Sequence, residues 1–281
     1  MKQLCDQLNL TTLATEVETL LETARQQQLS YEAFLDRALQ VELAGRQHRA
    51  QERRWRAARL PFPARIESFD FRFQPGVSER LLRELTSLAF LRSATNVVLL
   101  GPPGVGKTHL ACGLAVAVLE AGHTAQFVTL RDLLAQIDAP APRGGLAAVR
   151  RYSQPALLVI DEVGYTPVRS AQAHLLFELI LARYERRSTI LTSNLTFTEW
   201  GTLLGDEVLA TALLDRLLHH AEVITINGRS YRMRHRLLGD TPTATPSITI
   251  ARVGHFLLPI RVKSKLALTR SDRWAIIPKW G

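Results

Sequence analysis

The sequence predicts an α/β fold in which a parallel β-sheet is flanked by helices and preceded by a small N-terminal helical module. Three observations lead to this prediction. A glycine-rich phosphate-binding motif at residues 101–108 lies between an apolar, β-rich run and a helical segment. The continuous apolar run at 155–160 is typical of a strand buried on both faces of a parallel sheet. Residues 10–43 repeat apolar side chains at helical spacing.

Length and composition bound the class of protein. With 281 residues and 46% hydrophobic content, the chain can form one large domain and an appendage. Cys5 and Cys112 lie far apart in sequence, which indicates buried thiols more than a disulfide framework. No apolar run approaches the length of a membrane span, and the N-terminus lacks the apolar core of a secretory signal. We therefore expect a cytoplasmic protein that makes no contact with a membrane.

The first part of the chain is predicted to form two helices. Ser30 is a suitable N-cap for the second helix, with Glu32 in its first turn. No catalytic constellation occurs here, so we expect a helical module. The apolar stripe of the first helix consists of Leu13, Val17, Leu20, Leu21 and Ala24.

The net charge of +9 is concentrated in two segments. Residues 46–65 hold seven arginines against Glu52, and residues 241–281 hold seven Lys or Arg against Asp272, so each segment carries +6. Helical spacing places four arginines of the first segment along one face, which suits the phosphate backbone of a nucleic acid. A solvated charged face is the alternative. These expected DNA-binding residues, the arginine stripe, are Arg46, Arg49, Arg53 and Arg56.

Two segments leave alternatives open. Phe69, Phe71 and Phe73 alternate with charged residues, as in a strand or an extended linker with one buried face. These rings could lie beside an adenine base, although packing in the core is the ordinary place for them. The Pro/Gly-rich loop at 140–145, which carries Arg143, could contact nucleic acid or only solvent.

Residues 101–108 match every fixed position of the phosphate-binding loop motif G-x-x-x-x-G-K-[ST]. Glycines at this spacing let the backbone direct N–H groups at phosphate oxygens. We expect Lys107 to reach the β- and γ-phosphates of ATP and Thr108 to hold Mg²⁺. The residues expected to bind the nucleotide are Gly101, Pro102, Pro103, Gly104, Val105, Gly106, Lys107, Thr108 and His109.

Polar residues follow two of the expected strands. Asp161 and Glu162 come after the buried run, where Asp161 could hold Mg²⁺ through water and Glu162 could polarise an attacking water. Residues 188–192 form a further expected strand that ends before Asn194, whose amide would help to fix the same water. An acidic pair capping a turn and a turn-forming asparagine are the alternatives. Residues 124–130 are expected to form another strand.

Together these segments resemble the IstB-type transposition helper ATPases, which are AAA+ proteins related to the DnaC-type helicase loaders. The resemblance covers roughly residues 5–238. It rests on the N-terminal helices, the Phe69-Asp70-Phe71 linker, GPPGVGKTHLA, LLVIDEVGY, ILTSN, LDRLLH at 214–219 and GRSYRMR at 228–234. The phosphate loop and the Asp-Glu pair occur in many AAA+ proteins, whereas the later segments are more specific.

The resemblance implies an ATPase that assembles as a homo-oligomer on duplex DNA and works with the transposase of the same insertion sequence. Arg216 then resembles the finger supplied to a neighbouring subunit's nucleotide, and Arg232 resembles the sensor arginine within its own subunit. A surface salt bridge is the alternative for either arginine. The alternative function is that of a DnaC-like helicase loader, which acts mainly on a protein partner.

Two remaining features concern the C-terminal part. His219 and His220 would point in different directions on a helix, and the sequence offers no third ligand, so we expect no metal site there. After Asp240 the resemblance ends, and the basic residues that follow could contact nucleic acid or have no defined role. We divide the chain into an N-terminal helical module that binds DNA or a partner (1–60), an AAA+ ATPase domain (61–240) and a basic tail of unknown role (241–281).

Overall fold

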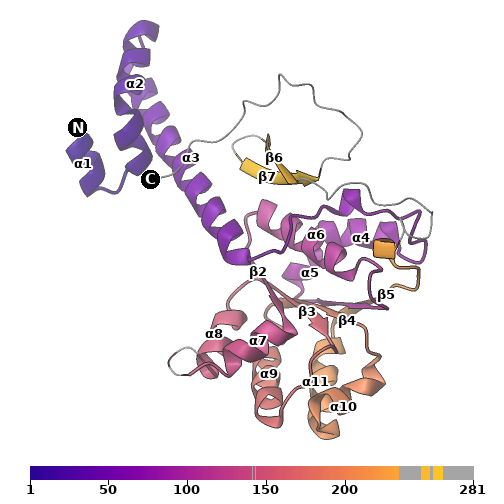
Figure 1. The fold of residues 1–281 in the computed structure, drawn as a ribbon. Helices are drawn as coiled ribbons and strands as arrows, with labels where there is room; N and C mark the ends of the chain where they lie inside the picture. Colours follow the sequence, from indigo (N-terminus) through magenta and orange to yellow (C-terminus); the bar gives the residue numbers. More distant parts are fainter. Residues whose placement is uncertain (141, 143, 234–247, 254–255, 262–281) are drawn as a thin grey trace.

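The computed structural model describes residues 1–140, 142, 144–233, 248–253 and 256–261, the last two ranges as backbone only (Figure 1). Its centre is a sheet of five parallel strands in the order β2-β3-β4-β1-β5. The predicted α/β fold class is therefore confirmed. The strands are β1 Asn96–Leu100, β2 Ala125–Thr129, β3 Leu157–Val163, β4 Ser188–Ser193 and β5 Ala221–Thr225.

The strand order decides where the functional residues meet. β4 lies between β1, which leads into the phosphate loop, and β3, which carries Asp161. Because all five strands are parallel, their carboxyl ends lie along one edge of the sheet. The expected strands at 96–100, 124–130, 155–160 and 188–192 are confirmed. β3 runs further than expected and includes Glu162.

Helices cover both faces of the sheet, in two layers with separate apolar clusters (Figure 1). The alternation of side chains along β1 shows the division, since Val97 and Leu99 join one cluster while Val98 joins the other. One layer contains α4 Glu79–Thr86, α5 Ala89–Arg92 and α6 Lys107–Glu120. The other contains α7 Leu130–Ile137, α8 Leu146–Ser153, α9 Ser170–Arg183, α10 Trp200–Leu204 and α11 Glu207–Leu218.

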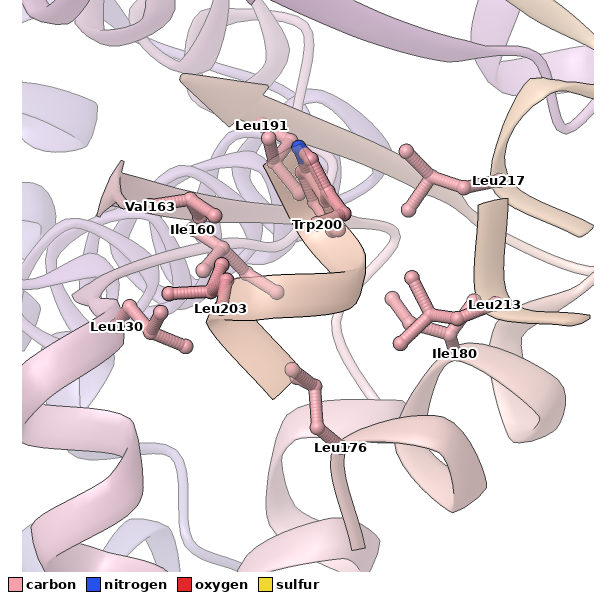
Figure 2. Close-up of a pocket in the computed structure, with 10 residues that line it drawn as sticks. All are labelled: Leu130, Ile160, Val163, Leu176, Ile180, Leu191, Trp200, Leu203, Leu213 and Leu217. Atoms are coloured by element: carbon pink, nitrogen blue, oxygen red, sulfur yellow. The ribbon is translucent and has the colours of Figure 1, made fainter. Parts of the chain in front are cut away.

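The second layer packs tightly beneath β3 and β4. Trp200 is 1% exposed and lies among leucine, isoleucine and valine side chains, as Figure 2 shows. These side chains leave a cavity of about 10 Å³ between the sheet and helices α9 to α11. An apolar space of this size is too small for a ligand. The role of this layer is therefore to pack against β3 and β4. The lining residues are Leu130, Ile160, Val163, Leu176, Ile180, Leu191, Trp200, Leu203, Leu213 and Leu217.

The N-terminal module consists of α1 Lys2–Gln7, α2 Thr11–Gln27 and α3 Tyr31–Ala58. Ser30 caps α3 as expected, since its hydroxyl accepts a hydrogen bond from the Ala33 N–H at 3.2 Å. Figure 1 shows α3 running away from the sheet, with α2 alongside its outer part and α1 next to α2. Its last turns are part of the sheet domain, because Ala58 is fully buried in the first cluster and Trp55 packs against it.

The segment between the module and the sheet contains turns and a short 3₁₀ helix, η1 Ile66–Ser68. Of the two alternatives for Phe69, Phe71 and Phe73, a strand or an extended linker, the strand is not formed, because backbone hydrogen bonds from Phe71 to Phe69 and from Phe73 to Asp70 close turns in this linker. Phe69 and Phe71 pack against the core, in edge-to-face contact at 5.1 Å. Core packing is thus the observed role of these two rings.

Two short 3₁₀ helices, η2 Phe197–Glu199 and η3 Tyr231–Met233, complete the sheet domain. β6 Ile248–Val253 and β7 Phe256–Arg261 form an antiparallel pair. Arg143 lies outside the described residues, and so do all parts of the expected tail except β6 and β7. Among the described helices, none combines the length and the apolar character that crossing a bilayer requires.

Candidate nucleotide site

The phosphate loop joins β1 to α6, and its backbone needs glycine at three positions, of which Gly104 and Gly106 face neighbouring side chains. Gly104 and Gly106 have φ angles of +83° and +106°. A Cβ atom at Gly104 would lie 2.2 Å from the Ser230 hydroxyl oxygen, and one at Gly106 would lie 2.6 Å from the Phe69 ring. The loop is therefore enclosed by the linker on one side and by the segment after β5 on the other.

Lys107 is the first residue of α6 and is 8% exposed. Its ammonium group donates hydrogen bonds to the carbonyl oxygens of Gly101 at 2.7 Å and Pro102 at 2.9 Å. Burial lowers the pKa of Lys107, and the Arg232 guanidinium lowers it further, whereas the Asp161 carboxylate opposes the shift. The lysine charge thus lies within the loop and close to both of these groups.

Asp161 lies at the carboxyl end of β3 and is 3% exposed. Its two oxygens accept hydrogen bonds from the Thr108 hydroxyl at 3.1 and 3.0 Å, and the Thr192 hydroxyl donates a further one. The expected metal pair, Thr108 and Asp161, is thus brought together. These oxygen donors are of the kind that Mg²⁺ prefers.

Thr192 is a site residue that the sequence reasoning missed. The register of β3 and β4 pairs Ile160 with Leu191, which places Thr192 beside Asp161. β4 contains Ser188, Thr189 and Ser193 as well, so a hydroxyl group in this strand does not by itself distinguish Thr192. Thr192 contacts Asp161 only because β4 lies next to β3, and the local sequence does not show which strands are neighbours.

Glu162 has an unusual backbone. Its φ angle is +61°, and the pairing of β3 with β4 shifts between Ile160 and Val163. The left-handed region costs a non-glycine residue about 1–2 kcal/mol, a strain often found at functional sites. The Glu162 N–H donates to the Thr192 hydroxyl at 3.1 Å, while its side chain remains exposed.

Asn194 follows β4 at the same edge. Its side-chain oxygen is buried and has no hydrogen-bond partner among the described residues. A Cβ atom at Gly164 would lie 2.6 Å from that oxygen, so the asparagine packs against the turn after Glu162. A buried acceptor without a donor is costly, and a bound water or ligand would satisfy it.

The segment after β5 brings Arg232 to the site. The Tyr231 N–H donates to the Gly104 carbonyl at 2.9 Å, which joins η3 to the phosphate loop. Desolvation and the Glu162 carboxylate raise the pKa of the Tyr165 hydroxyl, while Arg232 lowers it. Arg232 therefore acts electrostatically on both Lys107 and Tyr165.

His109 is held by the linker. Its Nε2 atom lies 3.2 Å from the Ser68 hydroxyl and 3.3 Å from the Arg65 carbonyl. Its ring centroid lies 5.9 Å from that of Phe69 and 6.2 Å from that of Phe62. Burial lowers the pKa of the imidazole. His109, which we expect to contact the nucleotide, therefore has its imidazole beside the aromatic linker.

Arg216 is not brought to the phosphate loop of its own chain. It lies near the end of α11, where it donates to the Ala212 carbonyl at 2.8 Å and stacks over the Phe177 ring at 5.1 Å. α11 leads into the amino end of β5, so Arg216 lies toward the opposite edge of the sheet. Five residues of strand separate the two edges by about 16 Å.

The arginine stripe divides into two pairs. Arg46 and Arg49 contact the buried carboxylate of Glu42 at 2.9 and 3.2 Å. Arg53 is exposed on the same helix, and Arg56 forms an exposed ion pair with Glu52 at 3.6 Å. The first pair is engaged within the module and the second is open to solvent.

Glu42 also fixes the start of α2. Its second oxygen accepts hydrogen bonds from the N–H groups of Thr12 at 2.9 Å and Leu13 at 3.0 Å. Burial alone would raise the pKa of Glu42, but the backbone hydrogen bond from Leu13, the Arg46 guanidinium and Thr12 together hold it below the usual value. The carboxylate therefore joins α2 to α3.

Two premises of the expectation about the histidines, divergent rings and a missing third ligand, are wrong. The rings of His219 and His220 lie side by side, with centroids 4.2 Å apart, because α11 ends at Leu218. Glu185, which follows α9, supplies a third group that can bind a metal. The third member is 34 residues away in sequence from His219, so the sequence could not indicate it.

The comparisons with known proteins agree with this geometry. A family model described as "IstB-like ATP binding protein" matches residues 3–239. A putative ATP-binding protein of insertion sequence IS21 from Pseudomonas aeruginosa is 45% identical over 84% of this chain and 89% of its own length. One of insertion sequence IS5376 from Geobacillus stearothermophilus is 40% identical over 84% of this chain and 94% of its own length.

A solved structure shares the fold. The crystal structure of DnaI is similar to this chain with a TM-score of 0.50 and 18% sequence identity, over 59% of this chain and 89% of that one. At this identity the likeness concerns the fold alone, which is that of the P-loop AAA+ proteins.

Proposed function

The chain belongs to the family of IstB-like ATP-binding proteins, and from that premise we propose that it is a magnesium-dependent ATPase that assists transposition. In this proposal it assembles as a homo-oligomer on duplex DNA and acts with the transposase of the same insertion sequence. The observation that carries the proposal is the grouping of the phosphate loop with Asp161 and Glu162 at one edge of the sheet. The names of the relatives supply the connection to insertion sequences.

Lys107 would hold the β- and γ-phosphates of ATP. Its ammonium group now donates to two carbonyl oxygens of the loop, so phosphate oxygens would replace those acceptors. The first N–H groups of α6 have no helical partner and would donate to the same anion, which the positive end of the helix dipole favours.

Thr108 and Asp161 would hold the magnesium ion. The oxygen donors fit a hard cation, and the Asp161 carboxylate is already oriented by two hydroxyl groups. When bound, Mg²⁺ would neutralise charge on the phosphate oxygens. Thr192 would act as a positioning residue, because its hydroxyl donates to Asp161 and accepts from the Glu162 N–H.

Glu162 would accept the proton of the attacking water. Its side chain is exposed at the carboxyl edge, whereas its backbone is held by Thr192. The unsatisfied side-chain oxygen of Asn194 would accept a hydrogen bond from the same water and so orient it. The contact of Asn194 with Gly164 keeps the amide close to the turn that carries Glu162.

The two arginines would act in different subunits. Arg232 acts on Lys107 within one chain, which suits a sensor of the bound phosphate. Arg216 lies toward the opposite edge, so it could reach only the nucleotide of a neighbouring subunit. Hydrolysis would then depend on assembly.

For DNA, Arg53 and Arg56 are the members of the stripe that remain open to a phosphate backbone. Arg46 and Arg49 would contribute charge but are tied to Glu42. A helicase-loading role is not proposed, because the likeness to DnaI concerns the fold alone.

The test is the rate of ATP hydrolysis with Mg²⁺, with and without duplex DNA. We expect DNA to stimulate the rate, because it would promote assembly. Glu162→Gln should retain ATP binding and lose hydrolysis by about 10²–10⁴-fold. Glu84→Gln, which changes an exposed glutamate on α4, is the matched control. A rate that Glu162→Gln leaves intact would exclude Glu162 as the base, and a rate indifferent to DNA would remove the DNA-dependent part of the proposal.

A further inference from the structure

Three side chains from two separate turns come together at the amino edge of the sheet. His219 and His220 follow α11, and Glu185 follows α9. One oxygen of Glu185 lies 3.7 Å from Nδ1 of His219 and 3.7 Å from Nε2 of His220. Each side chain is about half exposed, at 51–53%, so an ion could reach the group without any opening of the fold.

We propose that Glu185, His219 and His220 form a binding site for a divalent transition metal ion of the zinc class. Two imidazoles and a carboxylate are typical zinc ligands, with bond lengths of about 2.0–2.2 Å. Tetrahedral geometry at those lengths places ligand atoms about 3.4 Å apart. The two separations from Glu185, at 3.7 Å, would have to close by a few tenths of an ångström, and all three ligand atoms already lie within 4.8 Å of one another. Water or another group would take the fourth position.

The arrangement suits a metal ion better than a surface ion pair. One carboxylate oxygen faces a nitrogen of each imidazole, and the ring centroids are 4.2 Å apart, so all three ligand atoms border one position that an ion could occupy. A metal ion binds both rings in their neutral form. Among the residues that the structure describes, this is the one group of three such side chains with ligand atoms close enough together.

The surroundings hold the ligands in place. Glu185 has a φ angle of +56°, in a turn closed by the hydrogen bond from the Arg186 N–H to the Arg183 carbonyl at 3.0 Å. The Tyr184 hydroxyl lies 2.8 Å from Nδ1 of His219. A metal ion at Nδ1, the atom that lies 3.7 Å from Glu185, would replace this hydrogen bond, and the Tyr184 hydroxyl would remain next to the ligands.

The position of the proposed metal site connects it to Arg216. A bound ion would connect the end of α11 to the turn between α9 and β4. Arg216 lies three residues before His219, about one helical turn away. The ion would therefore stiffen the segment that carries Arg216, and it lies at the opposite edge from the Thr108–Asp161 pair.

The test is zinc binding to the full chain after treatment with a chelator, measured by titration calorimetry without nucleotide. We expect one ion per chain at this site and a rise in the melting temperature on adding zinc. The double variant Glu185→Gln/His220→Asn should weaken binding by about tenfold or more and lose the rise. His174→Asn, which changes an exposed histidine on α9, should match the wild type.

Cobalt and an active-site variant complete the test. Cobalt(II) should give the visible absorption of a four-coordinate ion in the wild type and lose it in the double variant. Asp161→Asn separates this site from the nucleotide site and should leave zinc binding at the amino edge unchanged. The proposal would be overturned if zinc failed to bind, if the double variant bound it as tightly as the wild type, or if binding vanished with Asp161→Asn. Retained ATP binding would show that the double variant is folded.

Discussion

The two edges of the sheet differ in how far a single chain completes them. At the carboxyl edge, Lys107 and Asp161 are buried, and each already has hydrogen-bond partners within the chain. At the amino edge, Arg216 and the Glu185–His219–His220 group are partly or fully exposed. Folding sets the geometry of the enclosed groups at the carboxyl edge, whereas the roles proposed for the groups at the amino edge need a neighbouring subunit or a bound ion. The same contrast recurs in the arginine stripe, where Arg46 and Arg49 are tied to Glu42.

The largest expected effect concerns Arg216, the half-buried arginine near the amino edge. Arg216→Ala should lower the ATPase rate by about 10³-fold, because an arginine supplied from a neighbour stabilises transition-state charge. ATP binding should remain, since Arg216 has no contact with the phosphate loop among the described residues. Rate measurements on Arg216→Ala, with Arg80→Ala on α4 as control, test this.

Mixing subunits sharpens the same prediction. Arg216→Ala and Glu162→Gln chains together should hydrolyse ATP faster than either alone, because one shared site can contain an intact Glu162 and an intact Arg216. If no mixing ratio exceeds the separate variants, Arg216 does not act between subunits.

The next largest effect on the ATPase rate is expected at Thr192, which is buried. Thr192→Val should lower the ATPase rate by about 10–100-fold, because the group that orients Asp161 and the Glu162 backbone would be lost. Raising the magnesium concentration should recover part of the rate, which titration of the rate against Mg²⁺ would measure. Thr198→Val, in η2, is the control. An unchanged magnesium dependence would show that Thr192 contributes to packing alone.

The exposed pair of the stripe should govern the salt dependence of DNA binding. Arg53→Ala/Arg56→Ala should flatten the slope of log affinity against log salt by about two units, because each lost phosphate contact removes one counterion release. Duplex binding across a salt series measures this, with Arg80→Ala/Arg92→Ala as a control of equal charge. A slope that changes only when residues 241–281 are deleted would assign DNA binding to the basic tail.

The smallest effect concerns Glu42, the enclosed partner of the other two arginines. Glu42→Gln should lower the stability of the N-terminal module by about 1–2 kcal/mol, as expected for loss of a helix-capping carboxylate. Because the pKa of Glu42 is lowered on folding, its contribution is present above the unfolded pKa of about 4.3 and is lost as pH falls through the folded value. Thermal unfolding of both chains between pH 7 and pH 3 should therefore show their difference shrinking in acid.

The sequence predicted what local patterns encode. The phosphate loop, the Asp161-Glu162 strand end and the central strands were found because composition and spacing are sufficient for them. β5 was missed because it pairs only with β1 and most of its residues are exposed, so its hydrophobic pattern is weak. Thr192 and Glu185 were missed because their partners lie about 30 or more residues away.

The arginine stripe also shows what the local sequence could not predict. Helical spacing correctly placed the four arginines on one long helix, but it could not show that Glu42 engages two of them. That contact depends on how α2 folds back along α3, which brings Thr12 and Leu13 to the same carboxylate. Arg53 and Arg56 are therefore the two residues on which a test of DNA binding should concentrate.

The length of α3 has a mechanical consequence. The helix contains 28 residues without interruption and is anchored at one end by Trp55 and Ala58, beside α6, the helix that begins at Lys107. At 1.5 Å per residue it is about 42 Å long, so a tilt of about 10° at the anchor would displace its far end by about 7 Å. A small displacement of α6 that tilted this anchor would thus become a larger displacement in the outer part of α3, against which α2 packs.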